Sequence, residues 1–520
     1  MKRISSVIIL VAAILISCKK ETASTQTSAK ASSPDGDKYS TLANLPFDGG
    51  YPTAESSRTL EDELYFQQAV QVYLWALPAV NMFAMKEGLG KTSGEGYNVI
   101  SVYEKRLKPI TTITTPNSDV IYALGFADLS KTGPLVLDVP PKLQGILDDF
   151  WHRPLVGPAK PDGTTYLGDI GFPGPDKGAG GKYIVIPPDY KGAVDTKGYY
   201  VYKSKTNGLF IFQRGFFTSV DDLSPGVKSV EGIKVFPLNG EKKPMEFKHV
   251  SDIKSNALFA HDFSYYEMLD RLIQSEQIDA VDPYMHGVLA VLGISKGEKF
   301  SPTERQKDLL DKAAKTAWRM AKNIAANYDK DKNSLWWKDR KWIAHAKTTY
   351  DDFYHSLLNE EFKNRKTGYD DINAKAQMYI NHYSISTGMI SSVVGLGAKY
   401  GNAYKDSEGN YLQGSNTYKM TFPANPPAGL FWSLTTYDAD TASGVDASGQ
   451  TYPSLNSMNN LVKNQDGSFT ILVGPEKPEG NVNWIKSVPN RGWFTLFRFY
   501  GPKKEYFERQ YKPGDFEKVK

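Results

Sequence analysis

The chain has 520 residues, one cysteine and a formal net charge of +4. Because single hydrophobic cores stop growing at roughly 250–300 residues, this length predicts two or more domains. Charged residues make up 23% of the chain and hydrophobic residues 40%, which is typical of a globular protein and excludes a wholly disordered one. Lysine and arginine form no run interleaved with aromatic residues, so the sequence excludes nucleic acid as a partner.

The first 18 residues have the pattern of a targeting segment. Lys2 and Arg3 precede the apolar run 7–16, which is too short to span a bilayer. The tetrad 15–18, Leu-Ile-Ser-Cys, resembles the lipobox of bacterial lipoproteins, in which the signal peptide is removed and the new N-terminal cysteine is acylated. This resemblance implies a signal peptide over residues 1–17 and a lipid anchor at Cys18.

The anchor has consequences for location and for chemistry. Lys19 follows the cysteine, where an aspartate would resemble an inner-membrane retention signal, so we expect a cell-envelope protein held at the outer membrane. The alternative is an ordinary secretory signal, which is disfavoured because the only cysteine stands at this position. An acylated Cys18 leaves no thiol for a disulfide, a nucleophile or a zinc site.

Residues 18–58 are rich in Ser, Thr, Ala and Lys without apolar periodicity, which predicts a flexible tether. The next feature is a helix predicted over Leu60–Ala76, with Thr59 as its N-cap and Pro78 bending or ending it.

Strand-rich segments flank a helical middle. Helical spacing of apolar residues runs over 261–328 and predicts helices there. Runs of β-branched and aromatic residues separated by turn residues predict strands at 120–126, 135–139, 183–186, 199–202 and 209–217, and again at 417–422, 430–437, 468–473 and 493–500. We therefore expect domains at 59–250 and 401–520 with a helical segment, 251–400, between them.

Several catalytic patterns fail on their context. Gly293-Ile-Ser-Lys-Gly297 has the spacing of a nucleophile elbow, but it follows the end of a predicted helix and is interpreted as a loop. None of the seven histidines forms a helical HExxH pair, and they are interpreted as capping or surface residues. The sequence thus indicates neither a metal nor a cofactor.

Two segments carry specific motifs. Residues 115–122, Thr-Pro-Asn-Ser-Asp-Val-Ile-Tyr, followed by 128–140, resemble the bacterial domain of unknown function numbered 1254. Residues 431–438, Phe-Trp-Ser-Leu-Thr-Thr-Tyr-Asp, and 497–502, Phe-Arg-Phe-Tyr-Gly-Pro, resemble its companion, numbered 1214. With the helical middle, the resemblance covers nearly all of the chain after the tether.

The resemblance implies a mainly β protein with a helical middle, α+β overall. It implies two β-sandwich domains, one immunoglobulin-like and one jelly-roll-like, joined by helices, in a secreted or envelope setting. It implies no reaction. The segment 144–169 departs from the pattern, because it lacks the expected aromatic-and-asparagine run.

Candidate ligand-binding residues lie in the two motif segments. Asn117, Asp119 and Tyr122 either clamp a turn or present an acceptor, a charge and a ring at the mouth of a sandwich. Arg498 lies in a strand too apolar to be solvated, and its burial requires a carboxylate, for which Asp438 and Asp119 are the candidates. This arginine forms either a structural ion pair or a clamp for an anion.

The third candidate segment is 148–153, Asp-Asp-Phe-Trp-His-Arg. Two carboxylates lie beside the indole of Trp151 and the imidazole of His152, although adjacent strand residues face opposite ways and a solvated loop is the simpler interpretation. Trp432, in the C-terminal motif, completes the set of ligand-binding candidates.

Two functions remain open. The first is an envelope lipoprotein that binds a small molecule, a glycan or a partner protein through sandwich loops. The second is a carbohydrate-active hydrolase or lyase that uses Asp119, Asp149 or Asp169 with aromatic stacking. Homo-oligomers are compatible with both hypotheses.

Overall fold

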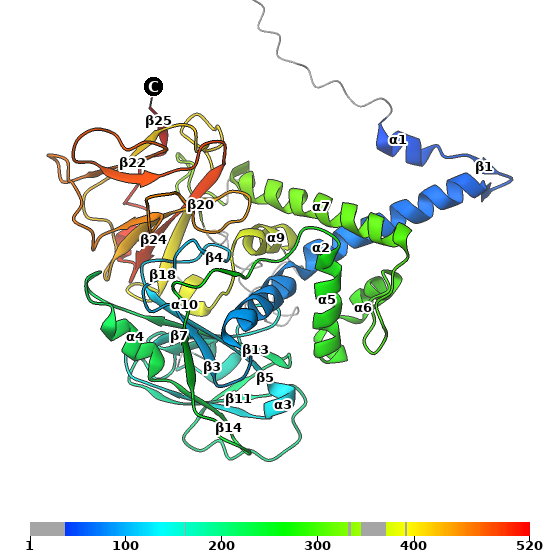
Figure 1. Ribbon diagram of the computed structural model, residues 1–520, viewed down its shortest axis with the longest axis horizontal. Helices are drawn as coiled ribbons and strands as arrows, with labels where there is room; N and C mark the ends of the chain where they lie inside the picture. The colour runs from blue at the N-terminus through cyan, green and yellow to red at the C-terminus, as the bar shows by residue number, and fades with distance from the viewer. Residues whose placement is uncertain (1–36, 162, 331–333, 345–370, 391–392, 520) are drawn as a thin grey trace, which may run out of the picture. The chain divides into compact units, whose positions relative to one another are not determined.

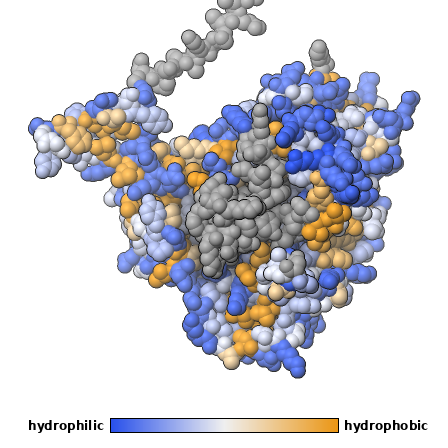
Figure 2. Space-filling model, turned by 180° about the vertical axis from the view of Figure 1, so that it is seen from behind, coloured by the Kyte–Doolittle hydropathy of each residue, from blue (hydrophilic) through white to orange (hydrophobic). Residues whose placement is uncertain are grey.

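The computed structural model describes residues 37–161, 163–330, 334–344, 371–390 and 393–519 (Figure 1). The predicted signal peptide, Cys18 and residues 19–36 of the predicted tether lie outside these residues and are grey in Figure 1 and Figure 2, whereas residues 37–58 of the predicted tether are described. The chain divides into two compact units, Met1–Glu61 and Asp62–Lys520. The described part of the first unit contains α1 (Lys38–Ala43), β1 (Phe47–Asp48), β2 (Tyr51–Pro52) and the start of α2 (Ala54–Ser93).

Helix α2 is longer than the sequence predicts. Its cap is Thr53, whose Oγ1 accepts a hydrogen bond from the Ser56 N–H at 3.2 Å, whereas Thr59 lies inside the helix and donates to the Glu55 carbonyl. The helix also continues past Pro78. A proline inside a helix costs about 3 kcal/mol, but both flanks of Pro78 are buried in the second unit, and this packing outweighs the lost hydrogen bond.

The N-terminal domain is a sandwich of two six-stranded sheets. The strands of the first are β3 (Val99–Val102), β5 (Ile121–Asp128), β7 (Gln144–Asp149), β10 (Asp169–Gly171), β13 (Gly208–Gly215) and β15 (Glu246–His249). Those of the second are β6 (Leu135–Val139), β8 (Val156–Ala159), β9 (Thr165–Leu167), β11 (Gly181–Ile186), β12 (Tyr200–Lys203) and β14 (Lys234–Pro237). The orders are β10-β7-β13-β5-β3-β15 and β14-β6-β11-β12-β8-β9. Helices α3 (Leu129–Thr132) and α4 (Ser224–Glu231) and the short pair β4 (Thr111–Thr112) and β16 (Ser255–Asn256) complete this region.

Strand alternation gives the first sheet two buried faces. On β5, Ile121 and Ala123 belong to the sandwich core, whereas Tyr122 and Leu124 belong to a second core beneath the helices. On β13, Phe210 and Phe212 point into that second core. The sheet is therefore covered on both sides, and a polar residue on its outer face is buried rather than solvated.

Helix α2 packs against this face, and the helices from the middle of the chain complete the second core with it. These middle helices are α5 (Ser264–Ser275), α6 (Pro283–Val291), α7 (Glu304–Ala326), α9 (Ile372–Asn381) and α10 (Thr387–Ile390), with the short turns η1 (Ile278–Ala280) and η2 (Tyr328–Lys330). A capping box of Thr303 and Gln306 begins α7. Gly293, with φ of 85°, follows α6, so the Gly293–Gly297 segment is the loop that the sequence predicts. Among the described residues, no helix is both long and apolar enough to cross a membrane.

The C-terminal domain is a second sandwich. One sheet contains β17 (Ile343–Ala344), β18 (Ala398–Ala403), β20 (Trp432–Asp438), β21 (Ser454–Asn456) and β24 (Trp493–Tyr500) in the order β17-β18-β24-β20-β21. The other contains β19 (Tyr418–Phe422), β22 (Phe469–Gly474), β23 (Asn483–Lys486) and β25 (Glu517–Lys518) in the order β23-β22-β19-β25. Helix α11 (Lys504–Phe507) follows β24. Phe497 and Phe499 face the core between these sheets, so Arg498 and Tyr500 face the opposite way.

The predicted fold class is confirmed. The chain is mainly β with a helical middle, and two sandwiches are joined by helices, as Figure 1 shows. The predicted domain limits, 59–250, 251–400 and 401–520, stay predictions.

Candidate functional site

A small cavity lies where the two sandwiches and the helical segment meet. Its volume is about 30 Å³, which exceeds the roughly 10–15 Å³ that one water needs. We call it the arginine cavity, because two arginines line it. Its lining residues are Thr115, Tyr122, Arg214, His382, Tyr383, Met389, Tyr400, Leu496, Arg498 and Tyr500.

Strand register brings the two arginines to this cavity. Arg214 of β13 lies opposite Tyr122 of β5, on the face that the helices cover. Arg498 of β24 lies opposite Tyr400 of β18, on the outer face of the C-terminal sandwich. Only 4% of Arg214 and 3% of Arg498 is exposed to solvent, so each charge is removed from water.

Arg498 is held by neutral acceptors. Its Nη1 donates to Thr435 Oγ1 at 2.9 Å, and its Nη2 donates to the Tyr437 hydroxyl at 2.5 Å. Nη2 also approaches the carbonyl oxygens of Thr115 and Pro116 at 3.3 and 3.4 Å. None of these groups carries a negative charge.

The predicted carboxylate partners of Arg498 are engaged elsewhere, and that prediction is wrong. Asp438 pairs with Arg491 through Oδ2, at 2.7 Å to Nε and 2.6 Å to Nη2. Asp119 pairs with Arg106 at 3.0 Å. The sequence does not indicate Arg106 or Arg491 as partners of these carboxylates, because neither arginine lies in a predicted strand.

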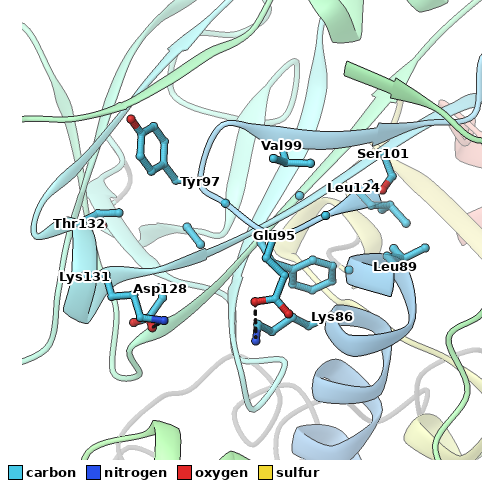
Figure 3. A pocket seen from close by; sticks show the side chains of 16 residues that line it. Lys86, Leu89, Glu95, Tyr97, Val99, Ser101, Leu124, Asp128, Lys131 and Thr132 are labelled. Atoms are coloured by element: carbon cyan, nitrogen blue, oxygen red, sulfur yellow. Dashed lines mark ion pairs between the residues drawn. The ribbon is translucent and has the colours of Figure 1, made fainter. Parts of the chain in front are cut away.

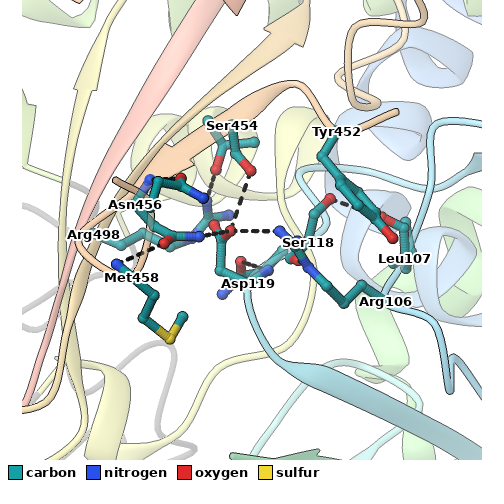
Figure 4. Close-up of polar contacts among 12 residues, drawn as sticks. Arg106, Leu107, Ser118, Asp119, Tyr452, Ser454, Asn456, Met458 and Arg498 are labelled. Carbon is teal, nitrogen blue, oxygen red and sulfur yellow. Dashed lines mark hydrogen bonds and ion pairs between the residues drawn. The ribbon is translucent and has the colours of Figure 1, made fainter. Parts of the chain in front are cut away.

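Asp119 is the centre of a cluster that spans both sandwiches (Figure 4). Its Oδ1 accepts hydrogen bonds from Asn456 Nδ2 at 2.7 Å and Ser454 Oγ at 3.2 Å, in addition to Arg106. The Arg106 guanidinium lies 3.9 Å from the centre of the Tyr452 ring. Asp119 thus has a structural role at the contact between the two domains, consistent with the turn-clamp interpretation.

Arg214 has weaker compensation than Arg498. Its Nε and Nη1 are buried and have no hydrogen-bond partner. Its guanidinium lies 4.8 Å from the centre of the Phe212 ring and 5.9 Å from that of Tyr122. Within the described ranges, no carboxylate forms an ion pair with Arg214 or Arg498.

The surrounding phenols do not supply the missing negative charge. Burial raises the pKa of Tyr437 to about 12 and also raises the pKa values of Tyr383, Tyr400 and Tyr500. These side chains are therefore neutral hydroxyls at physiological pH. Asn117 Nδ2 donates to the Tyr500 hydroxyl, while its Oδ1 accepts from the Asp119 N–H at 2.8 Å.

The loop after α9 carries His382 and Tyr383 into the cavity, and the short helix α10 that follows carries Met389. His382 Nδ1 lies 2.7 Å from Thr115 Oγ1. Two predicted site residues contact this segment. His152 Nδ1 accepts a hydrogen bond from the Ser384 N–H at 3.0 Å, and Asp169 Oδ2 accepts one from the Gly388 N–H of α10 at 2.9 Å.

The other predicted candidates do not join the cavity. Asp149 closes its own turn, accepting from the Trp151 and Arg153 N–H groups and pairing with Arg153 Nε at 2.6 Å. Trp432 is buried in the C-terminal core, and Trp151 lines a different hollow. Asn117, Tyr122 and Arg498 are the predicted residues that the structure brings together around the arginine cavity.

Arg214 could have been found from the sequence. Like Arg498, it is the single cation in a strand of aromatic and β-branched residues, here 208–215. His382, Tyr383 and Tyr400 give no such signal, because their placement depends on contacts between distant segments.

A larger hollow lies at the end of α2 beside β5, and Figure 3 shows its lining. Its volume is about 240 Å³. Lys86 pairs with Glu95 at 3.6 Å and Lys131 with Asp128 at 2.9 Å, so its charged groups satisfy one another. The described part of the chain also contains no group of three or more His, Cys, Asp or Glu side chains placed to hold a metal ion.

Two solved structures align with most of this chain. The VPA0106 protein of Vibrio parahaemolyticus aligns with a TM-score of 0.50 and 17% identity, covering 88% of this chain and 100% of its own. An uncharacterised protein of Burkholderia cenocepacia aligns with a TM-score of 0.39 and 11% identity, covering 90% and 96%. A comparison with curated proteins gives no match.

Two family models match the chain. Both are described as proteins of unknown function: DUF1254 matches residues 97–237 and DUF1214 matches residues 397–504. The first match contains Tyr122 and Arg214, and the second contains Tyr400 and Arg498. The chain therefore contains one region that matches each model, DUF1254 before DUF1214, which confirms the pair that its sequence motifs indicate.

Proposed function

We propose that the protein binds a small molecule through an anionic head group, a carboxylate or a phosphate, in the arginine cavity. One observation carries this proposal: two guanidinium groups are buried at one cavity, and no carboxylate of the described residues pairs with either. Burying an uncompensated charge costs several kcal/mol, and a bound anion removes this cost through charge-assisted hydrogen bonds.

The neighbouring groups suit the same ligand. The hydroxyls of Tyr383, Tyr400 and Tyr500 are neutral, and each carries a proton that it can donate to an oxygen of the ligand. Because each domain contributes one arginine, the ligand would be held between the two sandwiches. This arrangement explains why a ligand site would require both domains in one chain.

Hydrolysis of carbohydrate has less support. The three proposed catalytic carboxylates, Asp119, Asp149 and Asp169, do not line the arginine cavity, and each accepts hydrogen bonds from the protein. Binding is therefore the function that the geometry favours. The lipobox-like tetrad supports a place for this binding protein in the cell envelope, attached through Cys18.

The test is thermal unfolding in sodium phosphate and in sodium acetate, compared with sodium chloride at equal ionic strength. An anion that saturates the cavity at a hundredfold over its Kd stabilises the protein by about 2.7 kcal/mol. We expect this stabilisation to be absent from Arg214→Met, whose apolar side chain of similar length removes the charge.

Arg491→Met is the matched control, because Arg491 is half exposed and pairs with Asp438 on the surface. It should respond to phosphate and acetate as the unmodified protein does. Equal stabilisation by all three salts, or an unchanged response in Arg214→Met, contradicts the proposal.

A further inference from the structure

A second hollow, separate from the arginine cavity, lies between α2, α9 and the turn after β7. Its volume is about 280 Å³, near the lower end of the roughly 300–1,000 Å³ of ligand pockets. One wall is a single face of α2, with Leu74, Trp75 and Pro78, and the opposite wall is a face of α9 with Ala376 and Tyr379. Trp151 also lines this hollow, which we call the indole pocket.

Two indoles provide flat apolar surface in the indole pocket. The ring centres of Trp75 and Trp151 are 6.1 Å apart, and the rings are tilted by 54°. Both side chains are only half-buried, although tryptophan is usually buried more deeply on average. The rings therefore leave aromatic surface open to the hollow.

Hydrogen-bond donors and acceptors surround these rings. Arg153 Nη2 is buried without a hydrogen-bond partner, while the Nε of the same side chain pairs with Asp149. Gln71 and Asn373, both exposed, each add an amide with donors and an acceptor.

This combination selects a class of ligand. A pyranose ring has faces of C–H groups, which pack on aromatic rings, and a rim of hydroxyls, each both donor and acceptor. The positive charge of Arg153 is balanced by Asp149, and the pocket is also lined by Lys375 and Asp282, one charge of each sign, so its charges do not select an anion. We propose that the indole pocket binds one sugar ring of a carbohydrate, with Trp75 and Trp151 stacking on it and Arg153 donating to a hydroxyl.

The test uses isothermal titration of the protein with maltohexaose, cellohexaose, laminarihexaose and N-acetyl-chitohexaose. We expect one of these hexasaccharides to bind. Trp151→Ala should raise its Kd about tenfold, because this variant loses both the buried apolar area and the aromatic ring that packs on the sugar. Trp151→Phe keeps a ring and should raise the Kd much less.

Two further variants separate a lost contact from a damaged fold. Asn373→Ala changes an exposed side chain of the indole pocket and should weaken binding without lowering the thermal midpoint. Trp484→Ala, on β23 of the C-terminal sandwich, removes a tryptophan elsewhere and should leave the Kd unchanged. Arg214→Met should also bind the sugar normally, so this proposal and the anion proposal fail or succeed independently.

Absence of binding by all four hexasaccharides overturns the proposal. So does binding that is equally strong in the unmodified protein, Trp151→Ala and Asn373→Ala.

Discussion

At the scale of single residues, the arginine cavity depends on which way two strand positions face. Arg214 and Arg498 alternate with residues of their sandwich cores, so both turn toward the helices and the opposite domain. Neutral acceptors surround Arg498, whereas two buried nitrogens of Arg214, Nε and Nη1, have no hydrogen-bond partner among the described residues. Arg214 is therefore the residue whose environment an anion would change most.

Asp169 gives the free energy of unfolding a measurable pH dependence. Burial raises its pKa from 3.8 to about 7. Between these pH values the folded protein keeps a proton that the unfolded chain has released, so this group makes stability fall as pH rises from about 4 to 7. Asp169→Asn stays neutral throughout. We expect it to equal the unmodified protein near pH 4 and to exceed its unfolding free energy by on the order of 2 kcal/mol at pH 8.

Urea unfolding at the two pH values measures this difference. Burial also lowers the pKa of Lys399 to about 7, which acts in the opposite direction above pH 7. Because the Asp169 charge raises the pKa of Lys399, the difference at pH 8 includes the interaction of these two groups. Asp195→Asn, on an exposed turn, is the control and should show the same difference at both pH values. A pH-independent effect of Asp169→Asn would show that its carboxyl titrates normally.

Some of these residues can be predicted from the local sequence, whereas others depend on contacts between distant segments. Arg498 is recognisable because a cation in a strand of aromatic residues cannot reach water on either face. Its true neighbours, Thr435 and the Thr115 and Pro116 carbonyls, are not, because they depend on how two domains meet. The same limit applies to Asp119, whose role at the domain contact follows from its partners Arg106 and Asn456.

At the scale of elements, strands were predicted well and the long helix was not. The predicted strand 135–139 coincides with β6 and 493–500 with β24, because alternation and turn residues mark both ends. Helix α2 continues past Pro78, although a proline in the local sequence predicts that the helix ends or bends there. Strand β7 contains Asp148 and Asp149, which favoured a loop in the sequence, yet all six of its residues are buried.

The packing of α4 on β13 depends on a contact between two glycines. A Cβ placed on Gly215 would lie 2.0 Å from the Gly226 carbonyl oxygen, which is impossible without moving the helix. Because Gly215 follows Arg214, such a shift would also disturb the arginine cavity. We expect Gly215→Ala to lower the unfolding free energy by about 1–3 kcal/mol and to weaken any anion response.

Gly287→Ala provides the matched control on another element. Gly287 lies inside α6, is exposed, and has open space where a Cβ would be. This change should stabilise the protein by about 0.5–1 kcal/mol, because alanine favours a helix. Urea unfolding of both variants tests the argument, and equal stabilities for the two would refute it.

At the scale of the whole molecule, the segment 114–119 joins the two domains. Thr115 Oγ1 donates to the Asn381 carbonyl, Asn117 donates to Tyr500, and the Tyr437 hydroxyl donates to the Pro116 carbonyl at 2.6 Å. One turn of the N-terminal domain thus contacts the helical segment and the C-terminal sandwich. These contacts give the motif at 115–122 a structural role, because its turn meets several distant partners.

The proposed envelope location rests on the lipobox-like tetrad and predicts how the whole molecule distributes between membrane and soluble fractions. A thioether-linked lipid on Cys18 would hold the body at the membrane, since two or more acyl chains anchor a protein far more firmly than one. We expect Cys18→Ser to move the protein from the membrane fraction to the soluble fraction and to abolish labelling by an alkyne-bearing fatty acid. Ser17→Ala keeps the cysteine and a small residue beside it, and should remain membrane-bound and labelled. Continued membrane binding of Cys18→Ser without label would mean that another part of the chain attaches it, and the lipid anchor would then be wrong.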